Sequence, residues 1–272
     1  MKKTVARANR HFVPGQVWHL THRCHKREFL LKFGKDRHRW LQWLYKTKKQ
    51  YGLVILNYVV TSNHIHLVVH GKDSSETIPK SIQLLAGRTG QEYNQRKNRK
   101  GAFWEDRYHA TAIETGEHLL RCIVYVDLNM VRAGVVEHPK DWPHGGYIEI
   151  QRPRRKNILI DYEALAHLCG FNDLENFQSA HHSWIEAALT ANQINREKSW
   201  TQSIAIGSRS YIESVKNKFG GNAIGRKIRE LADGFELREP EPVYNALLGA
   251  KKDDIHSENC LFWNVLYNIL VG

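Results

Sequence analysis

The amino-acid sequence predicts an α+β protein in which helices cover an antiparallel sheet, and two observations lead to this expectation. Strand-like patterns recur over 16–22, 53–61, 65–70 and 108–114, and a tight link joins the second of these stretches to the third. Apolar residues at helical spacing occupy 35–51, 74–96 and 117–133. Short links between consecutive strands favour antiparallel pairing, and the helices between them would then cover the sheet.

The ends of the three helices carry residues that usually mark helix ends. Gly52 closes the first helix, and Pro79 lies in the first turn of the second, where a missing N–H costs nothing. The third helix ends near Gly134, a residue that suits the turn after a helix.

The composition of the sequence changes after residue 139. Residues 141–147 are rich in turn formers, and residues 152–156 form a basic linker. Helical periodicity then recurs over 161–169, 173–191, 208–219, 222–233 and 258–270. We therefore expect two parts, a catalytic or binding domain over 1–150 and a mostly helical C-terminal extension over 151–272.

Composition limits the class of protein. The chain has 272 residues, of which 42% are hydrophobic, so it can bury a core, but it has no apolar run of about 18 residues that would cross a membrane. The first residues lack the apolar stretch of a secretory signal. The four cysteines are scattered and form no CxxC pair, which favours a reduced, cytoplasmic protein over a zinc ribbon.

The positive charge is concentrated in the first part of the chain. The formal net charge is +12, and residues 1–50 alone hold 14 basic and 2 acidic side chains, whereas residues 151–272 hold 15 of each. Such asymmetry indicates a polyanionic partner such as nucleic acid, or otherwise a solvated basic surface. The side chains expected to contact phosphates as a set are Arg10, Arg23, Lys26, Arg27, Arg96, Lys97, Arg99 and Lys100. Trp104 and Tyr108 are expected either to stack on bases or to be buried.

Two histidines lie two residues apart in an apolar, β-branched stretch. Because a strand has a side-chain period of two, His64 and His66 point to the same face, while Ile65 and Leu67 point into a core. Two imidazoles on one face can chelate a metal ion. Without further ligands, such a pair would more often be ordinary residues at a sheet surface.

Tyr125 and Asn129 are four residues apart, so they lie on one face of the 117–133 helix. If this helix packs on the histidine strand, Asn129 could give its amide oxygen to the metal, or it could instead cap the end of the helix. Mixed nitrogen and oxygen ligands suit Mg²⁺ or Mn²⁺, although two histidines alone would also suit zinc.

A tyrosine beside a divalent cation and a basic surface indicates nucleophilic phosphoryl transfer. The phenol has an ordinary pKa of about 10 and needs help to attack at neutral pH. A cation on the scissile phosphate would polarise the P–O bond, and the product would be a covalent phosphotyrosine.

These residues resemble, in order and spacing, the IS200-like, single-tyrosine HUH transposases and, more narrowly, the REP-associated tyrosine transposases. The resemblance rests on residues 63–69 (NHIHLVV), 103–108 (FWEDRY) and 125–134 (YVDLNMVRAG), and it covers about residues 11–150.

The resemblance implies a ferredoxin-like sheet with helices, in an enzyme that cuts single-stranded DNA without a nucleotide cofactor. Its expected substrate is single-stranded or hairpin DNA at short palindromic repeats near its own gene. By this likeness, His64, His66 and Asn129 bind Mg²⁺ or Mn²⁺, and Tyr125 takes the 5′ phosphate and leaves a 3′ hydroxyl. Met130 stands where the family often has proline. A monomer is favoured for the REP-associated type, whereas dimers occur among the insertion-sequence relatives.

Two other functions fit parts of the sequence. A non-catalytic DNA- or RNA-binding protein could keep the same fold, but the retained histidines, tyrosine and asparagine count against it. A zinc-dependent hydrolase would leave Tyr125 without a role, and the chain has no HExxH motif.

Overall fold

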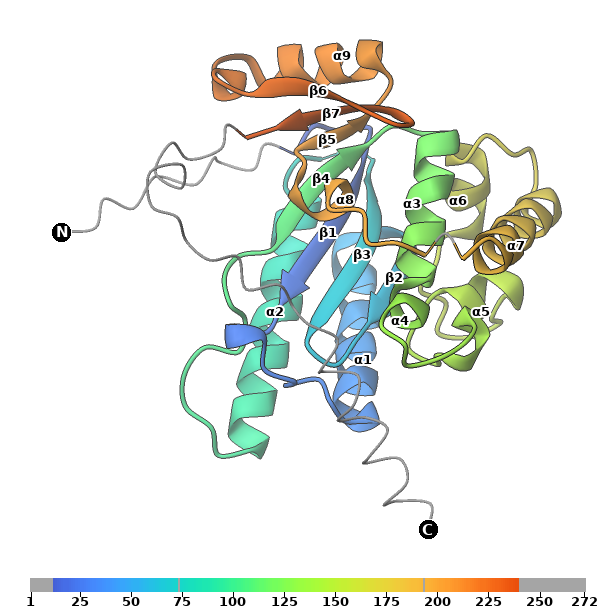
Figure 1. The fold of residues 1–272 in the computed structure, drawn as a ribbon. Helices are drawn as coiled ribbons and strands as arrows, with labels where there is room; N and C mark the ends of the chain where they lie inside the picture. The colour runs from blue at the N-terminus through green and yellow to red at the C-terminus, as the bar shows by residue number, and fades with distance from the viewer. Residues whose placement is uncertain (1–11, 73, 193, 240–272) are drawn as a thin grey trace, which may run out of the picture. The chain divides into compact units, whose positions relative to one another are not determined.

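The fold is organised around a mixed sheet, seen in a computed structural model that describes residues 12–72, 74–192 and 194–239 (Figure 1). Within these residues the sheet has seven strands in the order β2-β3-β1-β4-β5-β7-β6. The strands are β1 (Gln16–Arg23), β2 (Val54–Val60), β3 (His64–Gly71), β4 (His109–Ile113), β5 (Ala205–Gly207), β6 (Lys227–Leu231) and β7 (Gly234–Arg238). Neighbouring strands are antiparallel except β4 and β5, which are parallel. The predicted α+β class is confirmed.

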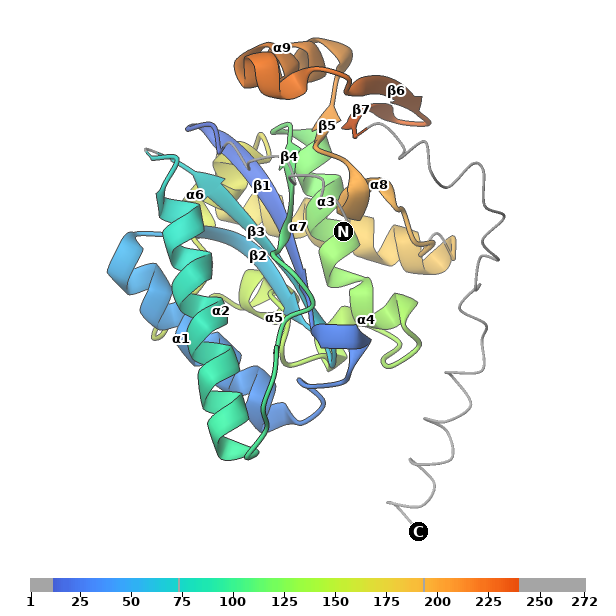
Figure 2. The same cartoon turned by 90° about the vertical axis from the view of Figure 1, so that its left-hand side faces the viewer.

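Helices cover both faces of the sheet. The α-helices are α1 (Gly34–Tyr51), α2 (Thr77–Arg96), α3 (Glu117–Asp127), α4 (Asn129–Arg132), α5 (Tyr147–Gln151), α6 (Tyr162–Leu168), α7 (Leu174–Thr190), α8 (Ser199–Gln202) and α9 (Arg209–Phe219). The short 3₁₀ turns are η1 (His25–Arg27), η2 (Pro139–Asp141) and η3 (Gly220–Ala223). Helices α1 and α2 pack together on one face of the first four strands, and α3 lies on the other face with α7 behind it (Figure 2).

Because helices cover both faces of the sheet, β3 is almost continuously buried. Ile65 and Leu67 are buried on the face that carries α1 and α2, as the alternation in the sequence predicts. His66 points to the opposite face, toward α3 and α4. A strand covered on both sides must bury alternate residues of both sets, so the polar residues on the α3 side need partners.

The predicted helix over 117–133 is two helices. Helix α3 ends at Asp127, and α4 begins at Asn129. Leu128 between them has φ −74° and ψ 3°, which opens the helical turn, although its N–H still bonds to the Val124 carbonyl at 3.0 Å. Tyr125 and Asn129 therefore lie on two consecutive helical segments.

The extension contains strands that the periodicity did not predict. The helix expected over 222–233 is wrong, because β6 and β7 form a hairpin across those residues. Gly225 and Gly234, with φ of +80° and +137°, lie on either side of β6 and favour the break from helical geometry. The helices expected over 161–169, 173–191 and 208–219 are confirmed as α6, α7 and α9, while 258–270 lies outside the described residues.

Residues on both sides of the expected boundary near residue 150 belong to one compact unit that ends at Glu239. Strand β5 of the extension pairs with β4, so the extension continues the sheet of the first part. The boundary remains a proposal about where the catalytic part of the chain ends. No helix among the described residues has both the length and the apolar character needed to cross a membrane.

Candidate metal and nucleophile site

Three of the predicted site residues meet on the face of the sheet that carries α3 and α4. The imidazole rings of His64 and His66 have centroids 5.1 Å apart. The Asn129 Nδ2 atom lies 3.0 Å from His66 Nε2, and the Asn129 side chain also interacts with His64. The structure thus brings together two imidazoles and one amide from β3 and α4.

A buried chain of hydrogen bonds determines the tautomer of His66. His19 Nδ1 lies 2.9 Å from the Trp200 carbonyl oxygen, which can only accept, so the proton is on His19 Nδ1. His19 Nε2 is then an acceptor in the neutral ring, and His66 Nδ1, 2.8 Å away, donates to it. His66 Nε2 keeps its lone pair and faces the Asn129 amide.

The tautomer of His64 follows from the turn before β3. Asn63 Nδ2 donates to the Arg27 carbonyl at 3.3 Å, so Asn63 Oδ1 is the atom that accepts from His64 Nδ1 at 2.7 Å. The Thr61 hydroxyl donates to the His64 carbonyl and lies 2.9 Å from the same Nδ1. His64 therefore also carries its proton on Nδ1 and leaves the Nε2 lone pair available.

Both candidate ligands are neutral near pH 7. Burial lowers the pKa of His64 to about 3, with further lowering by the charges of Arg23 and Arg196. Burial also holds the pKa of His66 well below its usual range, and neighbouring His19 and His64 act in the same direction. Neutral imidazoles with an unprotonated Nε2 are the form that binds a metal.

These residues fit a divalent cation. Each imidazole donates its other ring N–H to a fixed partner, which is the usual arrangement around a metal-bound histidine. Across the described residues, no group of three or more His, Cys, Asp or Glu side chains is placed to hold a metal. The candidate ligand set is instead two imidazoles and the Asn129 amide, a mixed nitrogen and oxygen set that suits Mg²⁺ or Mn²⁺.

Tyr125 lies on α3 beside this set and is 5% exposed. Its ring centroid is 6.0 Å from that of His66 and 6.2 Å from that of His19. Burial raises the pKa of the Tyr125 phenol, and the positive charges of Arg132 and Arg196 oppose this rise. The arrangement can present a phenol to a group bound at the imidazoles, with two arginines that favour its anionic form.

Arg132 is a site residue that the sequence analysis missed. Its guanidinium carbon lies 4.3 Å from the Tyr125 ring centroid, and its Nη2 donates to the Tyr125 carbonyl at 3.2 Å. Its Nε donates to the Ile194 carbonyl at 2.8 Å, while the buried Nη1 has no hydrogen-bond acceptor in the described structure. The spacing of seven residues from Tyr125, which is two helical turns, was a signal that could have identified it.

His19 was missed for a different reason. Its nearest histidine in the sequence, His22, is three residues away and therefore on the other face of the strand, and His19 reaches His66 only because β1 pairs with β3. Trp200, which accepts from His19 and packs 5.9 Å from Tyr125 between ring centroids, comes from α8 of the extension. Contacts across such sequence separations leave no local pattern.

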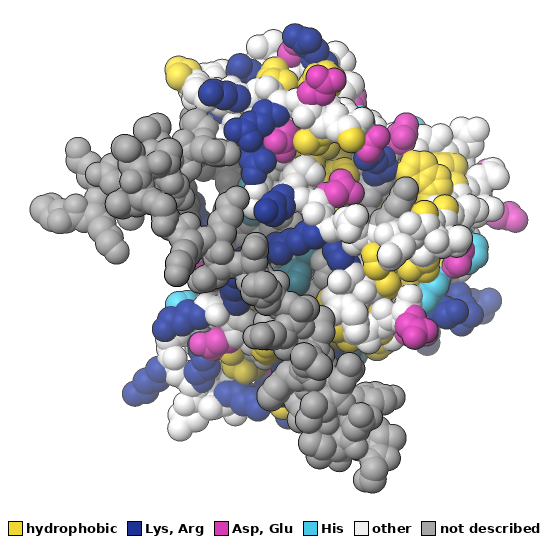
Figure 3. All heavy atoms as spheres, in the orientation of Figure 1, with side chains coloured by type: hydrophobic (Ala, Val, Ile, Leu, Met, Phe, Trp, Pro, Cys, Tyr) yellow, Lys and Arg dark blue, Asp and Glu magenta, His cyan; other side chains and the backbone are white. Residues whose placement is uncertain are grey.

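The basic residues proposed from the sequence gather mainly around two adjacent loops. The loop after β1 contacts the loop after α2 through the His25 N–H, which donates to the Phe103 carbonyl at 2.9 Å. Several Lys and Arg side chains lie in this region of the surface, with acidic and hydrophobic side chains among them (Figure 3). The exposed members of the set on these loops that form no ion pair with Asp36 or Glu28 are Lys26, Arg27, Lys97 and Lys100. Arg96 forms an ion pair with Asp36, and Arg99 forms one with Glu28, so these two arginines stabilise the loops. Arg23 lies opposite His64 in the β1–β3 ladder, and Arg10 lies outside the described residues.

Trp104 and Tyr108, the two aromatic residues expected either to stack on bases or to be buried, are partly buried and pack against the core. Trp104 Nε1 donates to the Ala86 carbonyl at 3.1 Å, and its ring stacks 4.0 Å from that of His22. Tyr108 lies 6.2 Å from the same histidine between ring centroids.

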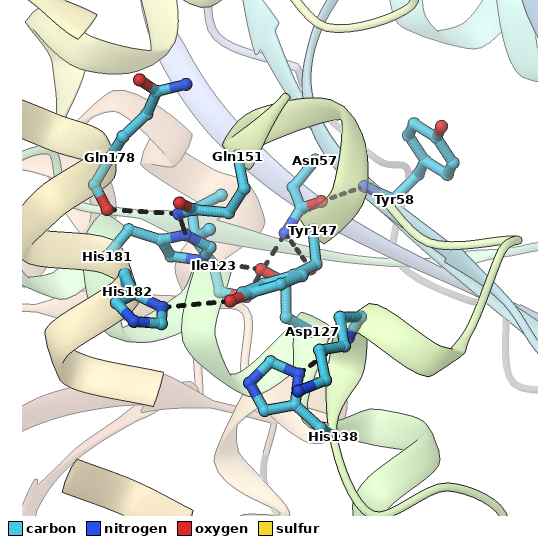
Figure 4. A network of polar contacts seen from close by, with 11 residues as sticks. Asn57, Tyr58, Ile123, Asp127, His138, Tyr147, Gln151, Gln178, His181 and His182 are labelled. Atoms are coloured by element: carbon cyan, nitrogen blue, oxygen red, sulfur yellow. Dashed lines mark hydrogen bonds and ion pairs between the residues drawn. The ribbon is translucent and has the colours of Figure 1, made fainter. Parts of the chain in front are cut away.

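A second buried polar network holds the end of α3 (Figure 4). His181 Nε2 of α7 lies 2.8 Å from Asp127 Oδ2, and both side chains are fully buried. Asn57 of β2 donates to Asp127 Oδ1 at 3.1 Å. Gln151 Nε2 donates to the Gln178 carbonyl and also lies 3.0 Å from His181 Nδ1. His181 Nδ1 therefore accepts a hydrogen bond from Gln151, and His181 Nε2 carries the proton that it donates to Asp127. The helix that carries Tyr125 is thereby anchored to both the sheet and the extension.

Taken together, the fold and these side chains define an α+β protein with a candidate cation site and an adjacent tyrosine. Residues 13–127 match the family model described as transposase IS200 like. The resemblance predicted from the motifs is thus confirmed over this segment, which is similar to the IS200-like transposases. The match includes His64, His66 and Tyr125 and ends before Asn129.

Two solved structures are similar in part. One is described as a REP-associated tyrosine transposase bound to a REP hairpin, with 19% identity, a TM-score of 0.45, and coverage of 57% of this chain and 94% of that one. The other is a candidate transposase from Deinococcus radiodurans, with 18% identity, a TM-score of 0.30, and coverage of 38% and 82% respectively. No protein with a curated description is significantly similar to the chain in sequence.

Proposed function

We propose that this protein is a metal-dependent endonuclease and strand transferase that acts on single-stranded DNA, at hairpin or palindromic repeat sequences of the REP type. The observation that carries the proposal is the meeting of Tyr125, His64, His66 and Asn129 at one point of a chain whose residues 13–127 match the IS200-like transposases. A monomeric, cytoplasmic enzyme is part of the same proposal.

His64 Nε2, His66 Nε2 and the Asn129 amide would hold Mg²⁺ or Mn²⁺. When bound, the cation polarises the scissile phosphate and stabilises charge on its non-bridging oxygens. The protein contributes ligands that are already neutral and already oriented, because Asn63 and His19 hold the two Nδ1–H groups.

Tyr125 would supply the nucleophile. Its phenolic oxygen forms a bond to phosphorus and loses its proton, while the bond from phosphorus to the 3′ oxygen breaks and that oxygen takes up a proton. The products are a 5′-phosphotyrosine and a free 3′ hydroxyl, which can attack in reverse to rejoin a strand. Arg132 stabilises negative charge at this point through its guanidinium, which lies against the Tyr125 ring.

The basic loops after β1 and α2 would hold the DNA backbone. Lys26, Arg27, Lys97 and Lys100 are exposed on adjacent loops, and one of these loops is hydrogen-bonded to Asn63 beside the candidate metal ligand. Contacts from such side chains are largely independent of sequence and depend strongly on salt. They would position a hairpin so that its single-stranded flank reaches Tyr125.

The deciding experiment uses labelled single-stranded DNA that carries a hairpin, incubated with the protein and Mg²⁺ or Mn²⁺ and then denatured on a gel. We expect a covalent protein–DNA adduct that is lost in Tyr125→Phe and in the presence of a chelator. An adduct that persists in Tyr125→Phe would mean that another residue is the nucleophile.

The alternative is a non-catalytic DNA- or RNA-binding protein that keeps the fold. Its supporting observation is the burial of Tyr125 under Trp200. Shifted DNA without an adduct on several hairpins, with both cations, would favour this alternative.

A further inference from the structure

The loop between β1 and α1 exposes aromatic side chains among lysines and arginines. Among the described residues, the exposed large hydrophobic side chains are Phe29, Phe33, Val135 and Ile224, and the two phenylalanines are 51% and 50% exposed. We call residues 24–33 the aromatic loop. Exposed phenylalanine is costly in water, so its presence on a basic loop indicates a partner with flat, apolar faces and negative charge.

Two lysine ammonium groups lie over the Phe33 ring. Lys35 Nζ lies 5.9 Å and Lys97 Nζ 5.2 Å from its centroid. The nearby acidic side chains Glu28 and Asp36 are ion-paired to arginines of the α2 end, so they do not neutralise these lysines. The ring and the two ammonium groups together match a base and its flanking phosphates.

The aromatic loop is joined to the candidate metal site by hydrogen bonds. The Cys24 N–H donates to the Asn63 carbonyl at 2.7 Å, and the Leu31 N–H donates to the Ser62 carbonyl at 2.9 Å. Within the loop, Lys26 and Arg27 adopt left-handed backbone angles, with φ of 50° and 60°, and Asn63 Nδ2 donates to the Arg27 carbonyl. A conformation that non-glycine residues rarely adopt is thus held in place beside the turn that precedes His64.

We propose that the aromatic loop is the binding surface for unpaired bases next to the cleaved phosphate. Phe33 stacks on a base, with Phe29 as a second apolar contact, while Lys35 and Lys97 pair with the adjoining phosphates. The proposal rests on the proposed function, because it requires that the substrate is DNA with a single-stranded flank.

The test compares Phe33→Ala with wild type on two DNAs, a hairpin with a single-stranded flank and the same hairpin with a blunt end. We expect Phe33→Ala to weaken binding of the flanked hairpin roughly 5- to 150-fold, the range for loss of one base stack, and to leave blunt-hairpin binding nearly unchanged. Phe33→Trp should retain affinity, and its fluorescence should be quenched by the flanked DNA. Val135→Ala, which truncates another exposed apolar side chain, is the matched control.

Unchanged affinity in Phe33→Ala, or equal losses on both DNAs, would overturn the base-stacking surface while leaving the nuclease proposal intact. Failure of the wild-type protein to bind any of these DNAs would instead remove the proposed function itself.

A separate observation concerns the buried chain from Trp200 through His19 to His66. All three residues are at most 2% exposed, and the two hydrogen bonds measure 2.9 and 2.8 Å. The final acceptor is a backbone carbonyl of α8, so the extension supplies the group that fixes the protons of both rings. An isolated imidazole is free to place its proton on either nitrogen.

We infer that His19 is a positioning residue that keeps the Nε2 lone pair of His66 directed at the cation, with the Trp200 carbonyl as its anchor. The inference rests on the metal ligands of the proposed function. It also gives residues 199–202 a role, because without their carbonyl the His19 tautomer would be undetermined.

Two readouts test it. In wild type without metal, long-range ¹H–¹⁵N NMR should show His66 protonated at Nδ1, and in His19→Leu this preference should be lost. Mn²⁺ affinity, followed by the electron paramagnetic resonance signal of the free ion, should fall roughly 10- to 100-fold in His19→Leu. His19→Gln, which can both donate and accept, should retain most of the affinity.

His22→Leu is the control for loss of a buried β1 histidine, because this residue bonds to the Asp106 carbonyl instead. Unchanged His66 protonation in a folded His19→Leu protein would overturn the inference. So would an equal loss of Mn²⁺ affinity in His22→Leu. If wild type binds no Mn²⁺, the metal proposal fails, whereas the NMR result still decides the tautomer.

Discussion

The buried pair of Asp127 and His181 offers the sharpest test of how the catalytic helix is held. In His181→Ala, the Asp127 carboxylate would keep only the Asn57 amide as its partner from the sheet, in a site where neither side chain of the pair is exposed. Breaking a buried pair by removing one partner typically costs about 3–5 kcal/mol, mainly because the other charge stays buried and unpaired. Loss of the His181 ring, which stacks 5.6 Å from Phe177, adds to this.

Urea or guanidinium denaturation followed by circular dichroism measures the free energy of unfolding. We expect His181→Ala to lower it by about 3–5 kcal/mol. His182→Ala is the matched control, since this neighbouring histidine is exposed and its nearest acidic partner lies 3.8 Å away, so it should cost less than about 1 kcal/mol.

The origin of the cost can be isolated with a second substitution. If the unpaired carboxylate is responsible, Asp127→Asn in the His181→Ala background should recover part of the lost stability. Because Asp127 is two residues from Tyr125, the single His181→Ala substitution should also slow adduct formation. A loss below about 1 kcal/mol in His181→Ala, or no recovery in the double variant, would refute the reasoning.

Three further predictions follow from individual contacts. Gly146→Ala should destabilise the fold by about 1–3 kcal/mol in thermal or chemical denaturation, because the new Cβ would overlap Asn57 Oδ1, which is held by hydrogen bonds; a neutral result would mean that Asn57 can move. Arg132→Gln should reduce the rate of adduct formation roughly 10²-fold or more while Arg132→Lys is less affected, and equal rates in all three proteins would remove Arg132 from the reaction. Lys97→Ala should lower the slope of log K against log salt by about 1, measured by fluorescence anisotropy, and an unchanged slope would place Lys97 outside the DNA contact.

Local pattern was sufficient for most of the fold and for the core of the site. The two-residue period of a strand places His64 and His66 on one face whatever the strand packs against, and the structure confirms that they lie together. Likewise, apolar spacing and end residues identified the helices α1, α2, α6, α7 and α9. These features depend on short stretches of chain and are therefore visible in the sequence.

Where local pattern failed, pairing between distant segments overrode it. Residues 227–231 carry spacing that suits a helix, but β7 offers a strand partner, and the hairpin extends the sheet through β5. Leu128 also interrupts a helix whose apolar spacing is continuous. Such outcomes depend on what lies across from a segment, which its own residues do not encode.

By itself, the sequence determined the α+β class, the paired histidines and the spacing of Tyr125 from Asn129, because each depends on the period of one strand or one helix. Only the tertiary structure decided that His19 and the Trp200 carbonyl set the proton on His66, that Arg132 covers Tyr125, and that His181 anchors Asp127. These contacts join residues far apart in the chain, apart from the pair on α3 and α4. Their hydrogen-bond geometry exists only once the sheet has brought those segments together.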